Sequence, residues 1–72
     1  MRIQINPDSS TPVFQQIVDQ IHFAITAGEL AQDKSLPSIR TIAAELSVAP
    51  NTVAKAFRQL EFRGVIKAHN RS

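Results

Sequence analysis

The chain has 72 residues, no cysteine, no tryptophan and no tyrosine, and a formal net charge of +2 at pH 7. This length allows one small domain at most. Hydrophobic residues make up 43% of the chain, yet no apolar run approaches the roughly 20 residues that a membrane span requires. The lack of cysteine excludes disulfides, and the polar residues 1–10 are unlike an export signal, so we expect a cytoplasmic protein with no membrane partner.

The charge is segregated along the chain. One basic residue against four acidic residues gives −3 over residues 1–33, whereas seven basic residues against two acidic ones give +5 over residues 34–72. A basic half of this kind is typical of a surface that faces a polyanion. Charges also divide unevenly by chance in short chains, so charge alone leaves nucleic acid as one alternative.

The first 28 residues predict an arm followed by an amphipathic helix. Residues 3–5 alternate apolar and polar side chains, which favours a short edge strand or an arm, and residues 1–10 form this N-terminal arm. Thr11 and Pro12 together are a helix-start signal, because threonine can cap free amides and proline tolerates the first helical position. The helix is expected to end at Gly28. Its apolar stripe consists of Phe14, Ile17, Val18, Ile21, Ala24 and Ile25.

Two shorter helices are expected after a connection over residues 29–37. Ser38 can cap the second helix, whose apolar positions end at Leu46. Residues 47–49 form a turn, and Pro50 opens a third helix that runs to about Arg63. Its apolar side consists of Val53, Ala56, Phe57 and Leu60, and its polar side consists of Asn51, Lys55, Arg58 and Gln59.

The chain ends in a strand-like run over residues 65–68, and residues 69–71 could begin the outgoing arm of a hairpin. A lone strand is not stable without a partner, so we expect the hairpin to be completed beyond Ser72. Catalytic, metal and cofactor sites are not expected, because the sequence has no metal-ligand cluster and no glycine-rich phosphate loop. We therefore expect a protein that is not an enzyme.

The two short helices joined by three residues can place the second of them in the major groove of DNA. Asn51 is then the candidate base reader, since its amide can both donate to and accept from adenine. Thr52 can contact a phosphate or a thymine methyl, Lys55 faces the same groove one turn later, and Arg40 reaches the DNA backbone. The alternative is the solvated polar face of an ordinary three-helix domain.

Four segments in order resemble the winged helix-turn-helix of the GntR family of bacterial transcription regulators. These are PVFQQI at residues 12–17, LPSIR at 36–40, IAAEL at 42–46 and VAPNTV at 48–53. The resemblance spans residues 12–68, and the sequence is most similar to the YtrA-like branch. Two departures are Ala49 at the expected N-cap of the third helix and Ser47 in place of the commoner turn glycine.

The resemblance implies a mainly α fold with a small β wing, a three-helix winged helix-turn-helix over residues 11–72 whose wing is incomplete. It also implies a repressor that binds a palindromic operator in double-stranded DNA as a homodimer. A region beyond Ser72 would dimerise and could sense a small-molecule effector. The DNA contacts implied are Ser38, Arg40, Asn51, Thr52 and Lys55, with Arg71 as the contact from the wing.

Other interpretations remain open at this stage. The domain could be a winged-helix module for protein interaction, or the DNA-binding head of a longer aminotransferase-like regulator. Phe23 and Phe62 lie off the apolar stripes of their helices. They are either single exposed aromatics, which are common, or contacts to a region beyond Ser72 or to a second subunit.

Overall fold

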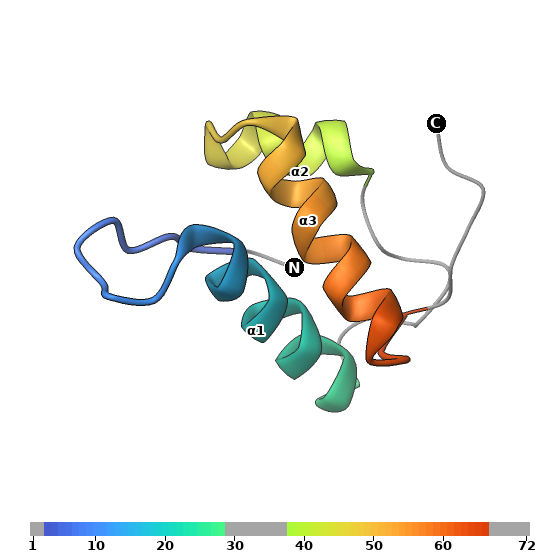
Figure 1. Cartoon of the computed structure of the whole chain (residues 1–72). Helices are drawn as coiled ribbons and strands as arrows, with labels where there is room; N and C mark the ends of the chain where they lie inside the picture. The colour runs from blue at the N-terminus through green and yellow to red at the C-terminus, as the bar shows by residue number, and fades with distance from the viewer. Residues whose placement is uncertain (1–2, 29–37, 67–72) are drawn as a thin grey trace.

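The computed structural model describes residues 3–28 and 38–66. It contains three helices, α1 (Val13–Thr26), α2 (Ile39–Leu46) and α3 (Pro50–Phe62). In Figure 1, α3 lies between the other two, and it packs against both α1 and α2, which do not approach each other closely. The three helices expected from the apolar periodicity are thus confirmed, with α3 as the common partner.

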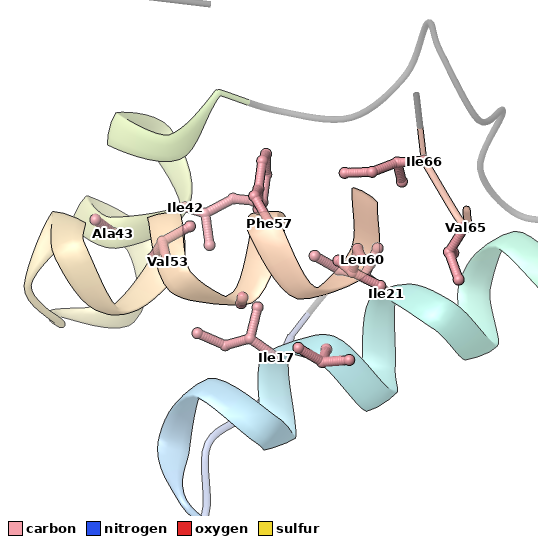
Figure 2. Close-up of a cluster of buried hydrophobic side chains, with 11 residues drawn as sticks. Ile17, Ile21, Ile42, Ala43, Val53, Phe57, Leu60, Val65 and Ile66 are labelled. Atoms are coloured by element: carbon pink, nitrogen blue, oxygen red, sulfur yellow. The ribbon is translucent and has the colours of Figure 1, made fainter. Parts of the chain in front are cut away.

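The core is assembled from the predicted apolar stripes and contains no buried polar or charged residue among the described residues. Figure 2 shows side chains from α1, α2 and α3 meeting there, with Val65 and Ile66 closing one end. Fully burying one branched side chain contributes about 1.5 to 3 kcal/mol. The buried residues are Ile17, Val18, Ile21, Ala24, Ile42, Ala43, Val53, Ala56, Phe57, Leu60, Val65 and Ile66.

The described part of the segment after α3 differs from the strand that the sequence predicts over residues 65–68. Val65 and Ile66 are buried against the core, but neither lies in a strand. The rest of the expected wing lies outside the described residues. The β wing therefore stays a prediction.

Two helices end in the same hydrogen-bonded motif, in which a left-handed residue turns the chain. After α3, Gly64 has φ +76°, and the Val65 N–H donates to the Leu60 carbonyl at 2.9 Å. After α2, Ser47 has φ 57° and ψ 43°, and the Val48 N–H donates to the Ala43 carbonyl at 3.0 Å. A serine thus occupies a conformation that usually favours glycine.

The helix starts confirm two sequence predictions and correct a third. Ser38 caps α2, because its Oγ accepts a hydrogen bond from the Thr41 N–H at 3.1 Å. Ala49 is the N-cap of α3 and provides no side-chain bond. The expectation that Thr11 caps α1 is wrong, since Pro12 is the N-cap at φ −56° and ψ 150°. The ring fixes φ near this value, and the extended ψ leaves Val13 as the first helical residue.

The N-terminal arm is held against α1 by two glutamine side chains. The Gln20 carboxamide accepts from the Gln4 N–H at 3.0 Å and donates to the Gln4 carbonyl at 2.7 Å. The Gln16 carboxamide does the same for Asn6, at 2.8 and 3.0 Å. Each carboxamide therefore takes the place of a peptide group in a neighbouring strand, while Ile5 packs against the core.

Candidate nucleic-acid interface

The candidate interface is built on α2, the turn over residues 47–49 and α3. The left-handed Ser47 ends α2, and Ala49, with extended backbone at φ −65° and ψ 140°, begins α3 after one intervening residue. Val48 between them is half-buried and packs against the core. This anchored residue fixes the turn, so the first turn of α3 is presented at a defined angle to α2.

The outer face of α3 presents exposed polar side chains to solvent. Asn51, Lys55 and Arg58 are exposed, and Thr52 is half-buried beside them. The opposite face carries the buried residues of α3 and packs into the core. Because the core fixes the rotation of the helix, the four polar side chains are held on one side of it, as the sequence predicted for Asn51, Lys55 and Arg58.

Ser38 and Arg40 lie at the start of α2 and have different surroundings. The Ser38 hydroxyl is occupied in the cap, and its Oγ is also 2.9 Å from the Thr41 Oγ1. Arg40 is exposed, and no described carboxylate pairs with it. Ser38 therefore serves first as a helix cap, whereas the Arg40 guanidinium is available to an anion. Arg71, the sixth predicted contact, lies outside the described residues.

The structure adds a contact that the sequence analysis missed. The Lys55 ammonium lies over the ring of Phe14, with Nζ 4.2 Å from the ring centroid. Phe14 is in the first turn of α1 and is half-buried against the core. The two residues are far apart in the sequence, and no local pattern connects them. The contact brings the first turn of α1 beside the second turn of α3.

Exposed basic side chains gather around these elements. Arg40, Lys55, Arg58 and Arg63 are all exposed, and none forms an ion pair within the described residues. A polyanion is the natural complement of such a surface, because contacts between phosphates and basic side chains dominate protein affinity for nucleic acids. In the described ranges, no group of three or more His, Asp or Glu side chains could hold a metal ion.

A helix pair with this turn and an open basic face on its second helix defines the helix-turn-helix class of transcription regulators. The chain belongs to the gntR family of bacterial regulatory proteins, whose family model matches residues 14–72. This match confirms the family expected from the sequence motifs.

Individual relatives agree with this assignment. The chain is 42% identical over 65 residues to the HTH-type transcriptional repressor YtrA of Bacillus subtilis, a match that covers 90% of this chain and 50% of that protein. It is 40% identical over 57 residues to the vitamin B6 salvage pathway transcriptional repressor PtsJ of Salmonella typhimurium, covering 79% of this chain and 13% of PtsJ. Both of these relatives are named as transcriptional repressors.

A solved structure shows the same fold. YtrA from Sulfolobus acidocaldarius, a GntR-family transcription factor, matches with a TM-score of 0.88 and 43% sequence identity, over 96% of this chain and 73% of that one. The three-helix arrangement described above is therefore that of the family. The chain spans about half the length of the Bacillus subtilis repressor. None of the helices in the described ranges is long and apolar enough to cross a membrane.

Proposed function

We propose that this chain is the sequence-specific DNA-binding domain of a cytoplasmic transcription regulator that acts as a repressor. The observation that carries the proposal is the outer face of α3, where Asn51, Lys55 and Arg58 are exposed on a helix whose rotation the core fixes. Asn51 reads a base in the major groove, and Thr52 contacts a neighbouring phosphate or a thymine methyl. Arg40 contacts the DNA backbone from the start of α2.

The proposal extends to the assembly that binds DNA. A single reading helix covers one half-site, and a two-fold dimer on a palindromic operator doubles the contact area. We therefore propose a homodimer, with the dimerising and effector-sensing parts outside residues 1–72. The half-length match to the Bacillus subtilis repressor supports a further region of this kind. The small share of PtsJ that is matched supports the alternative of a longer regulator that carries this domain.

The test separates base reading from backbone contact. The full-length protein is used to select duplexes from a randomised pool, and affinities for the selected and a scrambled duplex are measured across a salt series. We expect Arg40→Ala to weaken binding to both duplexes. It should also reduce the salt slope, which is the slope of log affinity against log salt concentration, by the amount that corresponds to about one phosphate contact. We expect Asn51→Ala to cost about 1 to 3 kcal/mol on the selected duplex and little on the scrambled one.

His22→Ala is a suitable control, because His22 is exposed on α1 and lies outside the proposed interface. It should leave both affinities unchanged. If neither Arg40→Ala nor Asn51→Ala alters duplex binding, α3 is not the reading helix. If the wild-type protein selects no duplex at all, the proposed DNA-binding function is refuted, and the interaction module is the alternative to test.

A further inference from the structure

Within the part of the chain that the structure describes, the Lys55 ammonium contacts the ring of Phe14. Phe14 is half-buried and packs against the core, which restricts the position of its ring. Lys55 is exposed, and Nζ sits 4.2 Å from the ring centroid. One side of the ammonium thus contacts an aromatic face. Because an ammonium has three N–H donors, it retains donors for an anion.

This contact displaces the ammonium from the centre of the outer face of α3. Lys55 lies one turn after Asn51, about 6 Å further along the helix axis. A lysine that pointed straight out would follow Asn51 toward the bases. The Phe14 ring belongs to α1, so Nζ is drawn to the flank of α3 that α1 covers. A helix in the major groove has the phosphate backbones at its flanks and the base edges in front of it.

We propose that Phe14 is a positioning residue that holds Lys55 as a phosphate contact on the α1 flank of the reading helix. The inference rests on the proposed DNA-binding function and changes the role of Lys55 within it, from a contact inside the groove to a contact with the backbone. Lysine has a flexible four-carbon stem, and ordering it costs conformational entropy. Because the ring holds the ammonium in place in the free protein, less conformational entropy is lost when DNA binds.

The magnitude follows from the strength of an exposed cation–π contact. Such contacts change an equilibrium constant by a factor of about two to five. Removing the ring should therefore weaken DNA binding by about that factor. The loss should be equal for every duplex sequence, since a phosphate contact carries no sequence information. Removing the charge of Lys55 should weaken binding further and reduce the salt slope by about one phosphate contact.

The test is a double-mutant cycle in the full-length protein, with a scrambled-sequence duplex as the probe. Phe14→Leu keeps apolar bulk but removes the ring, and Lys55→Met keeps the stem but removes the charge. We expect Phe14→Leu to weaken binding about two- to five-fold with the salt slope retained, and to have no effect once Lys55→Met is present. Phe14→Tyr should restore the affinity that Phe14→Leu loses.

Two further measurements separate positioning from a structural role. In the free protein, the ε-methylene protons of Lys55 should show an upfield ring-current shift that Phe14→Leu abolishes and Phe14→Tyr retains. Phe23→Leu makes the same substitution at an exposed phenylalanine of α1 and should leave the ring-current shift of Lys55 unchanged.

Three results would overturn this role. If Phe14→Leu lowers DNA affinity by the same factor in the Lys55→Met variant as in the wild type, Phe14 has a purely structural role. A change in sequence preference without a change in salt slope for Lys55→Met makes Lys55 a base contact. Failure of the wild-type protein to bind any duplex refutes the proposed function itself. The ring-current shift, measured without DNA, distinguishes that failure from failure of the Phe14–Lys55 contact.

Discussion

Replacing Ser47 with glycine should stabilise the domain. Ser47 holds φ 57° and ψ 43° at the end of α2, a conformation that costs an L-residue about 1 to 2 kcal/mol. Glycine adopts it without that cost but loses about 0.5 to 1 kcal/mol more conformational entropy on folding. The difference predicts a gain of about 0.5 to 1 kcal/mol for Ser47→Gly. For a domain of this size, the midpoint of thermal unfolding would rise by about 2 to 8 °C.

The assay is urea unfolding of the full-length protein, monitored by circular dichroism. The dependence of the free energy of unfolding on urea concentration is compared between variants. Gly64→Ala provides the mirror-image control, because Gly64 has φ +76° and no atom lies within 4 Å of the position that a Cβ would occupy. Its net cost should be about 0.5 to 1 kcal/mol, which is the backbone strain less the conformational entropy that alanine saves on folding. If Gly64→Ala destabilises the protein but Ser47→Gly fails to stabilise it, the reasoning about the α2 end is refuted.

Two other substitutions test the helix start and the arm. Ala49→Ser should stabilise α3 by about 1 kcal/mol, since it would recreate the cap that Ser38 provides for α2, and urea unfolding would detect the gain. Gln16→Ala removes the carboxamide that bonds both backbone groups of Asn6 and the Thr11 carbonyl. It should cost about 1 to 2 kcal/mol in total and speed hydrogen exchange at the Asn6 amide. An unchanged exchange rate would show that the arm is held by its apolar contacts alone.

The extent to which sequence predicts this domain differs between its local and its long-range features. Helix periodicity, the Ser38 cap and the end of the third helix near Arg63 depend on neighbouring residues, and the structure confirms all three. The Thr11 cap is wrong because two adjacent residues can each begin a helix, and only the backbone at Pro12 decides between them. Gln16 and Phe14 act on segments distant in the chain, so no spacing rule could have indicated their partners.

The candidate site shows the same division. The order of residues within α3 is sufficient to place Asn51, Lys55 and Arg58 on one exposed side, because the buried side fixes the helix rotation. The direction of the Lys55 ammonium depends on α1, which the pattern within α3 does not contain. The six predicted contacts remain predictions as DNA-binding residues, and the described part of the chain provides positions for five of them.

The hydrogen bonds of Gln16 and Gln20 to the arm also determine where the chain can accept insertions or deletions. Gln16 and Gln20 are four residues apart on a helix, a rise of about 6 Å, and they pair with Asn6 and Gln4, two extended residues that span about 6.6 Å. The two spacings nearly coincide, so an insertion between Gln4 and Asn6 would break one pair and turn Ile5 away from the core. Residues 7–10 form a turn in which the Asp8 and Ser9 amides donate to Asn6, and these local hydrogen bonds set no register against α1. Differences in length among homologous chains should therefore gather in that loop, while the arm keeps its register on α1.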